Sequence, residues 1–438
     1  MSNETVTQRP QSTEPSTSGV MAWSMTGLVI LLYMVNYADK AVYGIIAQPL
    51  ARELGLTSAE IGLVGSIFFL LFTLGGFSAG LIKRVAGLRW ALAGLAIVWA
   101  ASVLPVVLAA GFATLIVSRA ILGVAEGPSS ALMHTAVYSW HAPDKRGFPS
   151  AMLLGAISLA KIIFAPLLTW VTIQHGWRAA LIVMSIFAIV WSVLWLTTWR
   201  EGSHSAPKVA NAAGDTSIDR VPWSRILLSP SFVFGGLLFA SYYALQTVIL
   251  TWLPSYFELG LGYSAQEAGS MFALPSMVAL VVMLGGSKIS DRLMSKGASV
   301  RSSRVYLAAG AVVIGGALFA LVPYVQTPVL VVALVSFAYG IASLAAPLLN
   351  TAVSAICPPQ QLAGTLGVFL AIMSIGGLVA PYAAGVIVDN ASSEAVGFAT
   401  SFQILGGVAL LFALLALVFM RPDADRERLV GAPVGGSK

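Results

Sequence analysis

An acid and a base stand side by side inside a long apolar run of this sequence. Asp39 and Lys40 end the stretch 36–40 (Asn-Tyr-Ala-Asp-Lys), which lies late in the apolar segment 22–47. A charge at bilayer depth costs about 2.5–3.5 kcal/mol on insertion scales, so such residues usually face a cavity or a partner. Adjacent helical residues diverge by about 100°, so the two need not pair with each other. The stretch predicts a functional site, unless both side chains mark the helix end and extend to the interface.

A second acid and base lie in the apolar segment 113–138. Arg119 and Glu126 are seven residues apart, about two helical turns, and therefore face the same side. Burial favours the neutral carboxyl and a nearby cation favours the carboxylate, so Glu126 could bind a proton on one side and release it on the other. The alternative is a structural ion pair between helices. Gly127 and Pro128 predict a bend there, beside a cavity or for packing alone.

Lys161 lies well inside the apolar segment 148–171. A buried lysine needs an anionic partner. Three possibilities remain open from the sequence: Lys161 neutralises Glu126 or Asp39, binds a substrate carboxylate, or extends to the interface.

The second half of the chain offers only neutral polar groups inside its apolar segments. This division suggests one half that handles charge and one that fits the substrate body by hydrogen bonds and stacking, although helix packing explains any single residue equally well. The residues are Tyr242, Tyr243, Gln246, Thr247, Tyr339, Asn350, Ser374 and Tyr382.

Composition sets the class of protein. Of 438 residues, 58% are hydrophobic and 10% charged, against about 25% charged in a soluble domain. This predicts a helical membrane protein with many spans. The single cysteine, Cys357, excludes an internal disulfide framework, and four scattered histidines suggest no metal cluster. No nucleophile–base cluster indicates an enzyme, and no cofactor is expected. The first apolar run lacks a basic n-region and a cleavage site, so we expect a retained span.

Twelve apolar segments are long enough to span a bilayer. They are 22–47, 60–82, 90–110, 113–138, 148–171, 177–199, 231–257, 265–289, 304–324, 328–352, 362–388 and 397–420. We therefore predict an all-α membrane protein with twelve transmembrane helices in two parallel six-helix repeats. The expected domains are an N-terminal tail (1–21), a first bundle (22–199), a linker (200–230), a second bundle (231–420) and a C-terminal tail (421–438). A short helix is expected near the end of the linker.

Lysine and arginine predict the orientation, because cytoplasmic loops carry an excess of both. With both ends inside, the outer loops hold only Arg52 and Arg178. The inner loops hold Lys83, Arg84, Arg89, Lys145, Arg146, Lys208, Arg220, Arg225, Lys288, Arg292, Lys296, Arg301 and Arg304, and Arg421, Arg426 and Arg428 follow the last span. We expect both tails in the cytoplasm and the protein in the inner or plasma membrane.

Several motifs together resemble the major facilitator superfamily and, within it, the anion:cation symporter family. The resemblance is spread over most of the chain. The motifs are 36–40, Arg119-x3-Gly-x2-Glu126-Gly127, Trp140 to Gly147, Gly176-Trp177-Arg178, Thr251-Trp252-Leu253-Pro254 and Ser290-Asp291-Arg292-Leu293.

The resemblance implies alternating access, with two halves rocking about a central site. It implies that Asp39 and Glu126 bind protons, that the base after Asp39 binds the substrate carboxylate, that Arg119 couples the two, and that Tyr37 lines the cavity. Asp291, Arg292 and Arg84 match the family's gating positions at the inner face.

Three residues depart from the family pattern. Lys40 stands where arginine is usual, and a lysine lacks the bidentate fork. Lys161 stands where a small or neutral residue is expected, and could take over anion binding or add a second contact. Lys83-Arg84 replaces Asp-Arg, so the acid that would help close the inner face is missing.

We therefore predict a secondary transporter that imports a small carboxylate with protons. The expected substrate-binding residues are Lys40, Lys161, Arg119, Tyr37, Tyr243, Gln246 and Asn350. An organic-anion exchanger or facilitator without proton coupling, and a proton-driven drug efflux antiporter, are the alternatives. The expected partners are the anion, protons and lipid, with no nucleic acid, and a monomer is expected.

Overall fold

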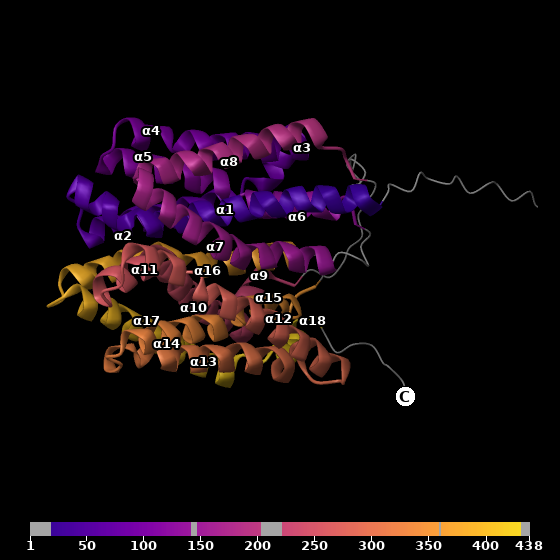
Figure 1. Ribbon diagram of the computed structural model, residues 1–438. Coiled ribbons are helices and arrows are strands. Elements are labelled where there is room, and N and C mark those ends of the chain that lie inside the picture. Colours follow the sequence, from indigo (N-terminus) through magenta and orange to yellow (C-terminus); the bar gives the residue numbers. More distant parts are fainter. Residues whose placement is uncertain (1–18, 142–146, 203–220, 359–360, 431–438) are drawn as a thin grey trace, which may run out of the picture.

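The computed structural model describes residues 19–141, 147–202, 221–358 and 361–430, and these form helices joined by short connections (Figure 1). In chain order the elements are α1 (Gly19–Leu54), α2 (Ser58–Gly76), α3 (Ala79–Ser102), α4 (Leu104–Leu108), α5 (Phe112–Glu126), α6 (Ser129–Tyr138), α7 (Gly147–His175), α8 (Trp177–Thr198), α9 (Trp223–Leu227), α10 (Pro230–Ser255), η2 (Tyr256–Gly260), α11 (Ala265–Met271), α12 (Leu274–Ser295), η3 (Arg301–Val305), α13 (Tyr306–Ala320), η4 (Val322–Tyr324), α14 (Pro328–Ala342), α15 (Ala345–Ser354), α16 (Leu362–Asp389), α17 (Glu394–Phe419) and α18 (Pro422–Val430).

Two groups of helices lie side by side along their lengths. In Figure 1, α1–α8 form the upper group and α10–α17 the lower group, here called the first and second halves. The start of α1 and the helix α18 lie at the same end of the bundle, which we call the terminal end, and the opposite end is the far end. The packing between the halves is carried by α2 against α16, α1 against α10, and α7 against α11 and α12. A site between the halves is therefore surrounded by α1, α2, α7, α10, α12 and α16.

Eleven helices of the described chain are long and apolar enough to cross a membrane, against twelve predicted spans. The difference lies in the fourth predicted span, 113–138, which is present as α5 followed by α6. Pro128 carries no backbone N–H and separates the two helices. An interruption alone does not remove a span, because α14 and α15 together are counted as one; the segment of α5 and α6 also carries Arg119 and Glu126, which lower its apolar character. The bend expected at Gly127–Pro128 is therefore a break directly after Glu126.

Glycines allow the two halves to approach closely. A Cβ added to Gly44 on α1 would lie 2.2 Å from the Leu250 carbonyl oxygen on α10, and one on Gly62 of α2 would lie 2.3 Å from that of Pro381 on α16. Neither distance can be tolerated by backbone atoms, so only glycine fits at these crossings. Both lie between the middle and the far end, where α1 and α2 are joined.

Parts of the predicted layout lie outside the described residues. These are most of the N-terminal tail, most of the linker, the last residues of the C-terminal tail, and Lys145, Arg146, Lys208 and Arg220. At the end of the linker, α9 (Trp223–Leu227) forms where a short helix is expected, and the C-terminal tail begins with the helix α18.

Candidate functional site

The first component of the candidate site is an ion pair between α1 and α5. Lys40 Nζ lies 2.5 Å from Glu126 Oε2 and 2.5 Å from Asn36 Oδ1, one helical turn earlier. Lys40 is 7% exposed and Glu126 is fully buried. Lys40 therefore neither extends to an interface nor stands free, because Glu126 provides its counter-charge in this conformation. Its contact with a substrate carboxylate stays a prediction.

Glu126 occupies the last residue of α5, beside the break. Ser129 donates its hydroxyl hydrogen to the Glu126 backbone carbonyl, which satisfies an oxygen that the interrupted helix leaves open. The second carboxylate oxygen, Oε1, is buried without a hydrogen-bond partner in the described chain. This oxygen has a free position for a proton, and protonation would remove the charge that holds Lys40.

Arg119 forms no ion pair with Glu126 or with another described carboxylate. Its guanidinium stacks on the Tyr43 ring at 4.0 Å, on the side of α5 that faces α1. Asp39, 7% exposed, interacts electrostatically with Arg119, Lys40 and Glu126, but no hydrogen bond or ion pair joins it to another described residue. Four of the five predicted charges thus lie together, with one direct ion pair among them.

A small cavity beside these charges reaches the second half. It is lined by Lys40, Tyr43 and Arg119 from the first half and by Leu250 and Thr251 of α10. The cavity therefore touches both halves, and in this conformation it is about the size of one water molecule.

Lys161, on α7, is the exception among the five. It is 2% exposed, and no described carboxylate oxygen lies within 4.0 Å of its nitrogen. Its partner is Tyr339 of α14 in the second half, whose hydroxyl lies 3.4 Å from Nζ and whose ring centre lies 5.1 Å away. The possibility that Lys161 neutralises Asp39 or Glu126 is therefore wrong, and so is extension to the interface. Among the residues that the structure describes, no acidic side chain compensates its positive charge.

Each of the two buried lysines lies beside a tyrosine. Lys40 Nζ lies 4.7 Å from the centre of the Tyr37 ring on the first half. Lys161 Nζ lies 5.1 Å from the centre of the Tyr339 ring on the second half. An aromatic ring therefore packs on each ammonium group.

The remaining predicted substrate residues lie on the second half. Tyr243 is partly exposed and packs edge-to-face on Phe69 of α2, with ring centres 5.9 Å apart. Gln246 is partly exposed one turn further along α10. Asn350 on α15 has a buried Oδ1 without a hydrogen-bond partner in the described chain. Each has unused hydrogen-bonding capacity.

Asn36 and Tyr339 belong to this site but are not among the expected substrate-binding residues, although Tyr339 is one of the neutral polar groups noted in the second half. Asn36 was visible as part of the stretch 36–40, and its contact with Lys40 follows from the four-residue spacing. Tyr339 offered only the signal of a hydroxyl in an apolar helix. Its contact with Lys161 depends on how α7 and α14 meet, which spacing along the chain does not encode.

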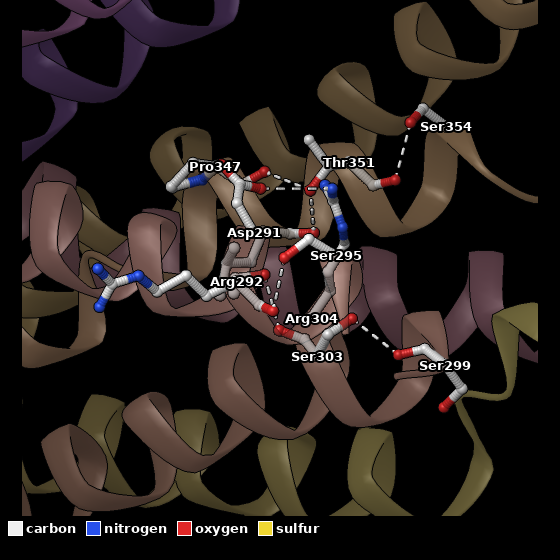
Figure 2. Close-up of polar contacts among 11 residues, drawn as sticks. Asp291, Arg292, Ser295, Ser299, Ser303, Arg304, Pro347, Thr351 and Ser354 are labelled. Atoms are coloured by element: carbon white, nitrogen blue, oxygen red, sulfur yellow. Dashed lines mark hydrogen bonds and ion pairs between the residues drawn. The ribbon is translucent and has the colours of Figure 1, made fainter. Parts of the chain in front are cut away.

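The predicted gating residues do not join the halves in this conformation. Figure 2 shows Asp291 paired with Arg304, which lies in the same half, at 3.7 Å, while Arg292 points away from the other labelled side chains. Arg84 is exposed on α3 and forms no ion pair with a described residue. The roles of these three residues in gating stay predictions.

The far end, in contrast, is closed by polar contacts between the halves. Asp389, the last residue of α16, accepts hydrogen bonds from the backbone N–H groups of Ser58 (2.9 Å) and Ala59 (2.7 Å) at the start of α2. We call this contact the far-end latch. Arg52 and Glu258 add an ion pair of 2.8 Å across the same end.

Local sequence positions the latch. Gly55 adopts a positive φ of 64° and ends α1, and Thr57 and Glu60 form a capping box that begins α2. The first backbone N–H groups of α2 have no partner within the helix, so a carboxylate from α16 is a favourable partner for them.

A helical membrane bundle with buried charges between two halves is the architecture of a membrane transporter and not of an enzyme. The sequence pattern described as "Major Facilitator Superfamily" matches residues 29–347 and 299–436. The chain belongs to this superfamily, as the resemblance implied.

Similar proteins agree with this assignment. The chain is 26% identical to the "Hexuronate transporter" of Bacillus subtilis over 93% of this chain and 95% of that protein. It is 28% identical to the "Probable galactarate/D-glucarate transporter" of the same organism, with the same coverage. Among solved structures, a bacterial homolog of the human lysosomal transporter Spinster, inward-facing and occupied, superposes with a TM-score of 0.75 at 18% identity, over 93% of this chain and 99% of that one. The last similarity shows the fold alone.

Proposed function

We propose that this protein is a secondary active transporter that takes up a small organic anion together with protons, by alternating access to the site between its halves. The observation that carries the proposal is Lys161. It is a cation buried between the halves whose only described polar contact is a neutral hydroxyl. Burying an uncompensated charge is costly, and a substrate carboxylate would provide the missing counter-charge.

The names of the relatives point to the same substrate class. The hexuronate and galactarate/D-glucarate transporters are named for sugar acids, which are small carboxylates. A buried cation repels cationic compounds, so Lys161 argues against drug efflux.

Proton coupling is assigned to Glu126 and Asp39. Protonation of Glu126 would break its ion pair and release Lys40 toward the substrate. Protonation of Asp39 would likewise remove a negative charge that acts on Arg119. Substrate binding and proton binding would then favour each other, which is what symport requires. Tyr37, Tyr243, Gln246 and Asn350 would contact the substrate body.

The orientation follows from the basic loops. The terminal end would face the cytoplasm of a cell whose plasma or inner membrane holds the protein, and a single chain would suffice. The far-end latch would then close the outer entrance after the substrate has entered. Asp291, Arg292 and Arg84 would form the contacts that close the inner face in the opposite state.

A thermal-shift screen of the purified protein against carboxylates tests the proposal. A carboxylate ligand should raise the unfolding temperature of the wild type and fail to do so in Lys161→Met. The matched control is Lys288→Met, which removes an exposed lysine from α12 and should retain the shift. A carboxylate that binds Lys161→Met as well as the wild type would contradict the proposed role of this lysine.

A further inference from the structure

A second cavity lies at the far end, apart from the buried charges. Its volume is about 320 Å³, which is enough for a small ligand. Its walls come from α1 and α2 in the first half and from α10, η2, α16 and α17 in the second. The far-end latch adjoins it, because Ser58, which donates its backbone N–H to Asp389, and Val388 both line the cavity. The cavity is therefore complete only while the far end is closed.

The charged groups that line this cavity differ in what already occupies them. Arg52 is held in an ion pair of 2.8 Å with Glu258. Glu394, exposed in the first turn of α17, forms no ion pair or side-chain hydrogen bond with another described residue. The unmatched charge of the lining is thus negative, opposite in sign to that of Lys161 in the central site, and it favours a cationic ligand.

The deeper part of the lining is apolar. Trp252 and Phe398 are 1% and 2% exposed, and Val388 and Leu259 extend the same surface. The Trp252 indole N–H is already donated to the Pro381 carbonyl oxygen, 3.0 Å away, so Trp252 offers a ligand only its ring. Walls of this kind fit an apolar or aromatic body, which a few polar groups then orient.

We propose that this cavity, here called the far-end site, binds a small organic cation whose ammonium group lies at Glu394 and whose apolar body packs on Trp252 and Phe398. A ligand that contacts both halves stabilises the closed far end by the difference between its affinities for the closed and open states. With the far end facing outward, such a compound acts from outside and inhibits anion uptake without entering the substrate site. The binding stands apart from the proposed function, whereas the inhibition rests on it.

Two probes with the same ring and chain length test the charge preference. 2-Phenylethylamine carries an amine, which with a pKa of about 10 is protonated at pH 7, whereas 2-phenylethanol is neutral. In calorimetric titration of the purified protein at low salt, the amine should bind about threefold or more tightly than the alcohol, as expected for an ion pair at an exposed position. Equal affinities, or no binding of the amine, would overturn the proposal.

Variants assign the binding to the far-end site. Glu394→Gln should remove the preference for the amine and leave the alcohol unaffected, and the control Glu427→Gln, an exposed acid of α18 at the terminal end, should behave as the wild type. Ala51→Phe fills the cavity and should weaken both probes about tenfold or more. Amine affinity that is unchanged in Glu394→Gln or in a folded Ala51→Phe protein would contradict the proposal. If Ala51→Phe fails to fold, Glu394→Gln and the two probes still decide.

The link to the closed far end is tested at a residue that does not line the cavity. Asp389→Ala releases the latch, so the amine should bind several-fold more weakly, because the complete cavity is less often present. In proteoliposomes, external amine should lower the maximal rate of carboxylate uptake, and Glu394→Gln should be inhibited less.

Inhibition that excess external carboxylate relieves would show competition at the substrate site and would overturn the inference. Unchanged amine affinity in Asp389→Ala would overturn the link to the closed state. If no carboxylate is taken up at all, the proposed function fails, while amine binding that is sensitive to Glu394→Gln still supports the far-end site.

Discussion

The two halves of the molecule share an architecture but turn different chemistry toward each other. The first half places Asp39, Lys40, Arg119, Glu126 and Lys161 inside its spans, whereas the second half faces them with tyrosines, Gln246 and Asn350. The neutral half still takes part, because Tyr339 contacts Lys161 and Thr251 lines the cavity beside Lys40. The difference teaches that the charged groups of the site can all come from one half, while the other half contributes neutral hydroxyl groups to their surroundings.

The largest effect, a loss of thermal stability, should come from breaking the Lys40–Glu126 ion pair within the charged half. Lys40→Met leaves Glu126 buried without its partner, and Glu126→Gln does the same to Lys40. Removing one member of a buried pair typically costs about 3–5 kcal/mol, so each single variant should lower the unfolding temperature in detergent markedly. The double variant should recover much of that loss, because the pair is replaced by neutral groups.

The control for this cycle is Arg178→Met, which removes an exposed ion pair with Glu53 and should change the unfolding temperature little. Additive losses in the double variant would show that Lys40 and Glu126 do not act as a pair.

An intermediate effect, easier opening of the far end, should follow when Asp389 of the second half loses its contact with the start of α2. Asp389→Ala removes two charge-assisted hydrogen bonds of the far-end latch, each worth about 1.5–3 kcal/mol. The far end should then open more often. In a Cys357→Ser background, a cysteine introduced by Ile61→Cys, buried near the latch, should be labelled by a maleimide at least about tenfold faster than in the parent.

The matching change at the other end is Asp291→Ala, which breaks a contact within the second half only. It should leave labelling by way of Ile61→Cys unchanged. Equal labelling rates with and without Asp389 would mean that the latch does not hold the far end closed.

The smallest effect should come from the neutral half. Tyr339→Phe keeps the ring beside Lys161 and removes only the hydroxyl, so a net loss of about 0.5–1.5 kcal/mol, several-fold in ligand affinity, is expected. Isothermal titration with the best carboxylate of the screen measures it. Tyr306→Phe, at an exposed position of α13, is the control and should bind as the wild type does. A loss as large as that of Lys161→Met would mean that the second half is not merely a neutral partner.

Much of the fold could be predicted from the sequence, because spans are set by apolar length and the break after Glu126 is set by Pro128. The sequence also singles out five charges inside the spans of the first half. Four of them, Asp39, Lys40, Arg119 and Glu126, lie together, whereas Lys161 does not. The ion pair between Lys40 and Glu126 was not predicted. Which base reaches Glu126, Lys40 or Arg119, depends on the rotation and height of α1 relative to α5. The isolation of Lys161 and the latch at Asp389 depend on contacts between the halves, which no local pattern encodes.

Uptake into proteoliposomes tests the central claim, that Glu126 couples anion movement to protons, most directly. With an inward proton gradient, the wild type should accumulate the carboxylate, and collapsing the gradient should abolish accumulation. Glu126→Gln should lose gradient-driven accumulation but keep exchange of labelled for unlabelled anion across the membrane. Accumulation that is independent of the gradient in the wild type and unchanged in Glu126→Gln would contradict the account, and would identify the protein as an exchanger or facilitator.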